Sequence, residues 1–194
     1  MYRSVIQAVA VLVFWVLTVS AAPPVQWKLE DGGNGHWYQV VHVPAGINWT
    51  AARDTAATIL PGGYLATITS AAENDFVWNE TEVGSNNDLW IIDGANNWEG
   101  PWLGGYRDPA LGWQWVTGEP WSFTAWATGE PNNSGGNEWC LQYFWNPSLP
   151  GELAVWNDVP SYNAIISFVV ESSIPEPATL VLLTLGCLVS IRRA

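Results

Sequence analysis

Hydrophobic and polar positions change their spacing several times along the chain, and these changes predict two helices. Apolar residues recur every three or four positions over residues 49–59, behind a potential N-cap at Asn48 and ahead of a Pro-Gly-Gly stop. A second helix is predicted over residues 70–83, because Ser70 and Glu73 have the spacing of a capping box. Both predicted helices lie in the first half of the chain.

Runs rich in aromatic and β-branched residues predict several short strands around the helices. The clearest runs cover residues 36–43, 64–68, 113–116, 140–145, 153–156 and 164–170. Residues 89–126 are interpreted as short strands and turns, and the adjacent Gly104 and Gly105 permit close approach of two backbones. Of the 15 tryptophans, 14 lie outside the predicted signal peptide. Most of these are expected in the core, and two or three on a surface where flat rings stack on sugar rings.

The first 22 residues predict an exported protein. They combine a basic start, an apolar run and a small-residue end, which is typical of a secretory signal peptide. An uncleaved membrane anchor is the alternative, but an apolar run of about 15 residues is short for a span. Residues 23–35 are rich in turn formers and are interpreted as a linker, so one folded domain is expected over residues 36–172.

The negative net charge of the chain argues against one class of partner, nucleic acids. The chain has 18 acidic and 6 basic residues, with a formal net charge of −12. Such a charge repels phosphate backbones, so nucleic-acid binding is excluded.

Cysteine and histidine suggest neither zinc binding nor catalysis. Cys187 lies in the terminal apolar stretch, so Cys140 has no disulfide partner within the domain and is expected to be a buried thiol. The two histidines, His36 and His42, have no acid or nucleophile at a catalytic spacing and are placed on the polar face of a strand. No enzymatic activity is therefore expected.

A candidate site lies in a glycine-rich loop and a later strand. It contains five oxygen-bearing side chains with no Lys or Arg nearby: Glu130, Asn132, Glu138, Asn157 and Asp158. Carboxylate and amide oxygens are the ligands that Ca²⁺ prefers, and the lack of His and of a paired Cys argues against zinc. The alternative is an ordinary turn, because residues 118–121 use nearly the same Gly-Glu-Pro turn without an Asn.

Several of these residues have the order and spacing found in one known family. The sugar-binding signature of C-type lectin-like domains resembles Glu130-Pro131-Asn132, the later Glu138 and Cys140, and Trp156-Asn157-Asp158. The segment Trp102-Leu103-Gly104-Gly105 is similar to the core tetrapeptide of that family. The order of helix, Gly-Gly, strand and second helix resembles its first half.

The resemblance implies a fold, a metal and a ligand. The fold is α+β, with two helices flanking small antiparallel sheets and a long irregular calcium-binding loop region. One calcium ion is held by Glu130, Asn132, Glu138, Asn157 and Asp158, and the bond between Glu130 and Pro131 is cis. Mannose-type hydroxyls of a glycan or exopolysaccharide then contact Glu130, Asn132, Glu138 and Asn157.

The sequence departs from the family at two points. The family pairs the Cys140 position with a cysteine just after Trp-Asn-Asp, but residues 159–161 are Val-Pro-Ser, so no such disulfide forms. A second calcium in the family uses the positions of Asn133 and Trp139, and Trp139 cannot be a ligand. One calcium site is therefore expected.

The end of the chain resembles a second known signal. Pro175-Glu176-Pro177, an apolar run over residues 178–191 and two final arginines resemble the bacterial PEP-CTERM sorting signal, here residues 174–194. The resemblance implies recognition by a sorting protease of the exosortase type, transient membrane anchoring through residues 178–191, and a final location at the cell surface or outside the cell. The alternative interpretation is an amphiphilic tail.

Calcium-dependent carbohydrate binding is the function that these features predict. A pair of carboxylates can hydrolyse glycosides, but here the acidic residues are grouped as ligands. A non-catalytic protein-binding or structural matrix domain of the same fold is the other alternative. The complete set of five ligands favours sugar binding.

Overall fold

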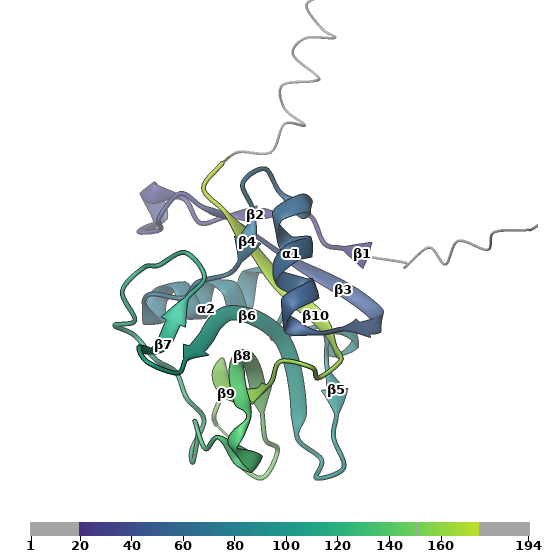
Figure 1. The fold of residues 1–194 in the computed structure, drawn as a ribbon. Helices are drawn as coiled ribbons and strands as arrows, with labels where there is room; N and C mark the ends of the chain where they lie inside the picture. The colour runs from purple at the N-terminus through teal and green to yellow at the C-terminus, as the bar shows by residue number, and fades with distance from the viewer. Residues whose placement is uncertain (1–19, 150, 175–194) are drawn as a thin grey trace, which may run out of the picture.

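The computed structural model describes residues 20–149 and 151–174 of the chain (Figure 1). Most of the expected signal peptide, and Pro175-Glu176-Pro177 with the apolar run that follows, lie outside these residues. Within the described part of the chain, no helix is long and apolar enough to cross a membrane.

Helix α1 (Trp49–Ile59) forms where the apolar spacing predicts it. The side chain of Asn48 accepts a hydrogen bond from the N–H of Ala51 at 2.9 Å, so the predicted N-cap is confirmed. Ala52 and Ala56 are fully buried. The local sequence therefore determines both the start and the buried face of this helix.

Helix α2 (Ala71–Glu80) is shorter than predicted, and half of its capping box is replaced. The Ser70 hydroxyl accepts from the N–H of Glu73 at 3.2 Å. The Glu73 carboxylate instead accepts from the N–H and hydroxyl of Thr69, at 2.7 and 2.8 Å. Glu73 is 1% exposed, and its tertiary contacts take the place of the reciprocal cap.

Ten strands form the sheet structure. They are β1 (Ser20–Ala21), β2 (Val25–Gln26), β3 (Trp37–Ile47), β4 (Tyr64–Leu65), β5 (Ile91–Ile92), β6 (Trp98–Asp108), β7 (Gly112–Trp115), β8 (Glu138–Trp145), β9 (Val155–Pro160) and β10 (Ile165–Ser172). Three short 3₁₀ turns complete the elements: Leu29–Asp31, Asn87–Leu89 and Ser134–Gly136.

The strands run in the order β1, β3, β10, β6, β8, β9, with β2 on β3, β4 on β10, and β5 and β7 on β6. All described pairs are antiparallel except β10 with β6, which meet at Phe168 and Trp102. Figure 1 shows β6 curving across the centre of the molecule, between β3 and β10 on one side and β8 and β9 on the other.

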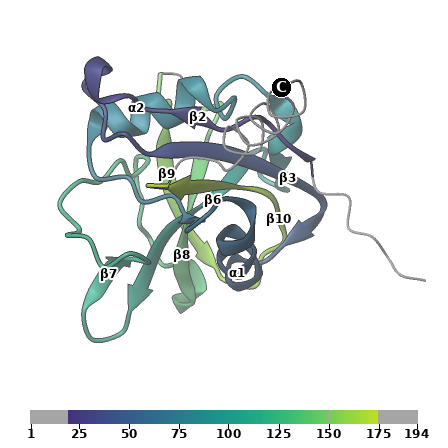
Figure 2. The same ribbon diagram turned by 90° about the horizontal axis from the view of Figure 1, so that it is seen from above.

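Two hydrophobic cores lie on the two faces of β3 and β10. Val40 packs in the core that contains Val77 of α2, whereas Val41 packs in the core that contains Ala52 of α1. Alternation along a strand explains this division, because successive side chains point to opposite faces. Figure 2 shows the two helices on opposite sides of these strands. The predicted α+β class, with two helices beside a sheet, is confirmed.

The Trp102-Leu103-Gly104-Gly105 segment lies in the middle of β6. Trp102 is fully buried and its indole N–H donates to the carbonyl of Ile47 at 2.9 Å. A Cβ atom on Gly104 would lie 2.4 Å from the carbonyl oxygen of Leu65. The expected close approach of two backbones is therefore present, and a larger residue would separate β6 from β4.

Residues 23–35, interpreted as a linker, pack against the domain. Strand β2 pairs with β3, with Val25 opposite Tyr38. The ring of Trp27 stacks on that of Phe76 of α2, with centroids 5.6 Å apart. The physical reason is the apolar surface of Val25 and Trp27, which is partly buried here although turn formers surround it in the sequence.

Candidate functional site

Two backbone hydrogen bonds bring the loop before β8 to the start of β9. The N–H of Ala127 donates to the carbonyl of Trp156 at 2.9 Å, and the N–H of Trp156 donates to the carbonyl of Ala125 at 2.8 Å. The indole of Trp156 is fully buried in the core below. The loop that follows residue 127 therefore begins beside the Trp-Asn-Asp segment.

Asp158 joins the tip of this loop to β9. Its carboxylate accepts hydrogen bonds from the N–H groups of Asn132 and Asn133, both at 3.0 Å. The residue is 1% exposed, so these bonds are made in a largely dry environment where they are strong. The structure thus brings together two segments that the sequence analysis singled out, although they lie far apart in the chain.

The side chains of Glu130 and Asn132 are hydrogen-bonded to each other. The peptide bond between Glu130 and Pro131 is cis. The Asn132 amide donates to one Glu130 oxygen at 2.9 Å, and the Asn132 N–H approaches the other at 3.1 Å. Both side chains therefore lie on the same side of the loop as the Asp158 carboxylate.

Glu138, the first residue of β8, points back to the same loop. One of its oxygens accepts from the N–H of Ser134 at 2.6 Å, and this N–H also lies 2.7 Å from the amide oxygen of Asn132. Oxygens of Asn132 and Glu138 therefore meet at one backbone donor.

The three carboxylates of this site repel one another. Burial, with smaller contributions from the charges of Asp158 and Glu138, raises the pKa of Glu130 to about 7. Burial, and then the charge of Asp158, also raises the pKa of Glu138. The ion pairs found in the described residues involve Lys28, His36 and Arg53, none of which lies in this site. No Lys, Arg or His of the described residues therefore forms an ion pair with these carboxylates.

Asn157 contributes a polar atom that the protein itself does not satisfy. Its amide oxygen is buried and has no hydrogen-bond partner among the described residues. A buried acceptor without a donor costs about 1–3 kcal/mol. A cation coordinated by this oxygen would remove that cost. The cross-strand neighbour of Asn157, Gln142, is fully buried and its amide likewise has no partner.

This donor set fits a calcium ion. Its oxygens come from the carboxylates of Glu130, Glu138 and Asp158 and the amides of Asn132 and Asn157, and hard oxygen ligands are those that calcium takes. No three His, Cys, Asp or Glu side chains in the described part of the chain form a metal cluster by themselves. The two asparagines would therefore be essential members of the set.

Two cavities flank Asn133 beside this site, and Arg107 lines both. One, of about 330 Å³, is also lined by Trp113, Pro131 and Asp158. The other, of about 210 Å³, contains Trp139. Asn133 and Trp139 are the positions that the resemblance described in the sequence analysis associates with a second calcium. The guanidinium of Arg107 places positive charge there, which disfavours a second cation.

The sequence indicates no acidic partner for His36, which lies one residue before β3, but the structure provides one. Its Nδ1 lies 2.6 Å from a carboxylate oxygen of Glu171 on β10, and the Tyr38 hydroxyl donates to Glu73. The hydrogen bond to Glu171 raises the pKa of His36 against the opposite effect of burial. Burial raises the pKa of Glu73. His36 and Glu171 are 135 residues apart, and no local pattern in the sequence indicates this contact.

Cys140 is a buried thiol, as predicted. It is 3% exposed and has no disulfide partner in the described residues. Burial raises its pKa to about 12, so it is protonated and unreactive at neutral pH.

Comparisons with known proteins identify one family. The family model described as "Lectin C-type domain" matches residues 45–165. The chain is 36% identical to lectin BRA-3 of Megabalanus rosa, over 69% of this chain and 74% of the relative. It is 31% identical to a "C-type lectin mannose-binding isoform" of Oxyuranus scutellatus, over 71% of this chain and 77% of the relative. For a further lectin relative, the chain spans 60% of its length.

Solved structures show the same fold. The C-type lectin CEL-I from Cucumaria echinata superposes with a TM-score of 0.53 at 21% identity, covering 70% of this chain and 89% of that one.

Proposed function

The chain belongs to the lectin C-type domain family, and from this premise we propose that it binds glycans through one calcium ion. The ion would be held by the oxygens of Glu130, Asn132, Glu138, Asn157 and Asp158. The observation that carries this proposal is the pair of 3.0 Å hydrogen bonds from Asn132 and Asn133 to Asp158. They support the proposal because they bring the loop that carries Glu130 and Asn132 against the strand that carries Asn157 and Asp158.

The protein residues would do two things at this site. Asp158 fixes the loop on β9, and Glu130, Asn132, Glu138 and Asn157 would bind sugar hydroxyls, with carboxylates accepting hydrogen bonds and amides donating them. Calcium, when bound, supplies a charge to which two neighbouring sugar hydroxyls coordinate. We expect mannose-type hydroxyls, because the Glu-Pro-Asn order is the one that the resemblance associates with them, and one relative is named mannose-binding.

Retention on a mannose resin tests this function. The purified chain should bind the resin with calcium and elute when a chelator is added, because the sugar contacts need the ion. Asn157→Ala should pass through the resin under both conditions. Retention that survives the chelator, or a variant that binds as well as the wild type, would contradict the proposal. Such results would favour the protein-binding or matrix alternative.

The proposal extends to location. We propose that residues 1–22 direct export, that residues 36–172 hold the binding domain, and that an exosortase-type protease recognises Pro175-Glu176-Pro177 while residues 178–191 anchor the chain. The domain would then present its glycan site at the cell surface or in the extracellular matrix. Mass spectrometry of the mature protein checks this, and a mass equal to that of the whole chain would contradict it.

A further inference from the structure

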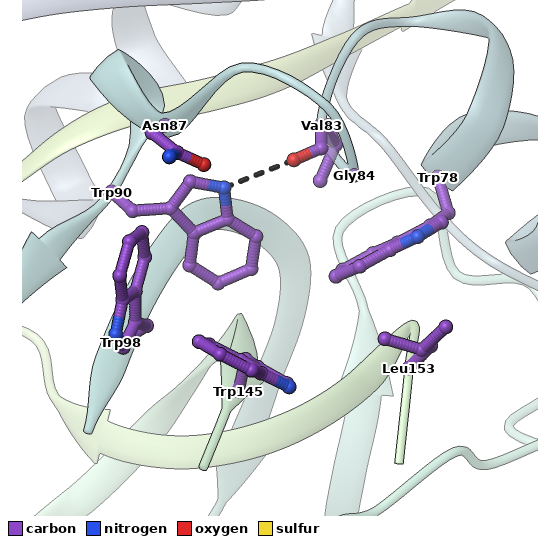
Figure 3. Close-up of a pocket in the computed structure, with 8 residues that line it drawn as sticks. All are labelled: Trp78, Val83, Gly84, Asn87, Trp90, Trp98, Trp145 and Leu153. Atoms are coloured by element: carbon purple, nitrogen blue, oxygen red, sulfur yellow. Dashed lines mark hydrogen bonds between the residues drawn. The ribbon is translucent and has the colours of Figure 1, made fainter. Parts of the chain in front are cut away.

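A further cavity lies at the other end of β8 from the proposed calcium site and from the two cavities beside it. Glu138 begins this strand and Trp145 ends it, so the two positions are roughly 23 Å apart at about 3.3 Å per residue. The cavity has a volume of about 280 Å³, and four tryptophans line it, namely Trp78, Trp90, Trp98 and Trp145 (Figure 3).

The indole rings are held in fixed positions around this cavity. Trp78 and Trp90 pack edge to face with centroids 5.7 Å apart, and Trp98 and Trp145 do so at 5.3 Å. The Trp90 N–H donates to the carbonyl of Val83 at 2.9 Å. Figure 3 shows Trp90, Trp145, Trp78 and Leu153 around a common opening. Rigid aromatic faces of this kind bind a flat apolar surface at little entropic cost.

Two glycines allow this arrangement. A Cβ on Gly84 would lie 2.2 Å from the indole nitrogen of Trp78, and a Cβ on Gly100 would lie 2.3 Å from the ring of Trp90. No larger residue fits at either position without moving a ring. The cavity wall is therefore built by close contact of indoles with backbone.

Polar groups at the cavity wall remain available for a ligand. The hydrogen bond from Trp90 to Val83 is the one drawn among the lining residues in Figure 3. The indole N–H groups of Trp98 and Trp145 and the side-chain amide of Asn87 form no hydrogen bond to another residue that lines the cavity. Asn87 is exposed at the rim, and Trp98 and Trp145 are half-buried. The site thus combines apolar faces with a few donors, as small-molecule sites do.

Charge decides the class of ligand. The segments that form the wall, residues 78–98 and 145–153, contain acidic residues but no Lys, Arg or His. Anionic groups are therefore repelled. A trimethylammonium group would suit the aromatic faces, but it neither donates nor accepts hydrogen bonds and would leave the available donors unused. A neutral pyranose matches both features, because its C–H face packs on indole rings and its hydroxyls accept from N–H groups.

We propose that this tryptophan cavity binds one neutral sugar unit of a glycan without calcium, as a second saccharide site. The proposal rests on the proposed function for the class of ligand, a glycan. It uses none of the residues of the proposed calcium site. A domain with two sites on opposite ends of one strand can hold two stretches of polysaccharide, which raises avidity without further contacts.

Calorimetric titration of the full chain with mannotetraose, with calcium and then with excess chelator, tests the proposal. One class of binding should persist in chelator. It should weaken at least about tenfold in Trp98→Leu and in Trp145→Leu, which remove ring faces but keep apolar bulk. Trp27→Leu is the matched control, since Trp27 is also half-buried and stacked, and it should bind as the wild type does.

Several outcomes would overturn the second site. Absence of binding in chelator, with calcium-dependent binding intact, would remove it and leave the proposed function standing. Chelator-resistant binding that survives both tryptophan variants would place it elsewhere. Displacement of mannotetraose by choline would assign the cavity to quaternary ammonium ligands. If the variants do not fold, ¹⁹F spectra of 5-fluorotryptophan-labelled wild type decide, because mannotetraose in chelator must then shift indole resonances.

Discussion

Gln142 of β8 and Asn157 of β9 each carry a buried side-chain amide oxygen, and we expect only one of the two to bind calcium. Gln142 and Asn157 are register partners, and each has an amide oxygen without a hydrogen-bond partner in the described residues. Each oxygen destabilises the folded state, because burial removes its hydrogen bonds to water and supplies none in return. We propose that the amide oxygen of Asn157 coordinates calcium and that the amide of Gln142 does not.

This assignment predicts opposite behaviour toward calcium. Gln142→Met should raise the free energy of unfolding by about 1–3 kcal/mol, because it replaces an unpartnered amide with an apolar chain of similar shape. The gain should be the same with and without calcium. Asn157→Leu should also stabilise the calcium-free domain but should lose the rise in melting temperature on adding calcium. Thermal unfolding of both variants measures this, and a normal calcium response in Asn157→Leu would contradict the assignment.

The raised pKa of Glu130 predicts how pH changes both the stability of the calcium-free domain and its affinity for calcium. Its pKa is raised from 4.5 to about 7, so its contribution to stability is present below pH 4.5 and is lost as pH rises through about 7 in the calcium-free domain. Calcium needs the ionised carboxylate, so apparent calcium affinity should fall as pH falls below about 7. Glu130→Gln should remove part of the pH dependence of the calcium-free melting temperature. An identical pH profile in wild type and variant would contradict this.

At the scale of elements, contacts between distant strands decide what local patterns leave open. His36, just before β3, bonds to Glu171 of β10, and Tyr38 of β3 bonds to Glu73 of α2. Glu171 also accepts from the N–H of Thr67 at 2.8 Å. This network fixes the beginning of β3 to β10 and to the start of α2.

The network should make domain stability depend on pH. Because the pKa of His36 is raised, its contribution is fully present below pH 6.5 and is lost as pH rises through the folded-state pKa. His36→Gln should therefore lower the melting temperature at pH 6 and much less at pH 9. His42→Gln is the control, because His42 makes no ion pair among the described residues. Equal destabilisation by His36→Gln at both pH values would contradict the ion pair.

Local signals predict local elements, and they predict little else. The start and buried face of α1 follow from Asn48 and a 3.6-residue period. Strand β6 extends over Trp98–Asp108, but Gly104 and Gly105 interrupt its pattern, so the sequence predicts short pieces. The Glu73 carboxylate does not complete the capping box of α2, because it accepts a hydrogen bond from the Tyr38 hydroxyl instead.

The candidate site is predictable for a different reason. Its residues were found through spacing in two short motifs, and the structure joins these motifs by hydrogen bonds at Ala125, Ala127 and Asp158 that no pattern in the sequence reveals. No pattern in the sequence indicates the tryptophan cavity. The residues that form it come from two separate segments, residues 78–98 and 145–153, and only their packing distinguishes its tryptophans from the fully buried Trp102, Trp115 and Trp156.

For the whole molecule, the chain combines strong negative charge with rings that pack its core and its surface. A formal net charge of −12 attracts divalent cations and repels acidic polymers. The predicted end of the signal peptide, after Ala22, would remove β1, which pairs with β3 at His42 and Val41. The exported domain would then keep β2 as the partner of β3 on that side.

Calcium titration of the wild type by calorimetry, together with Asn157→Ala and Asp158→Ala, tests the central claim most directly. The account predicts one calcium ion per chain, and loss of that binding in both variants while their circular dichroism remains that of the folded domain. A wild type that binds no calcium, or variants that bind it with unchanged affinity, would contradict it.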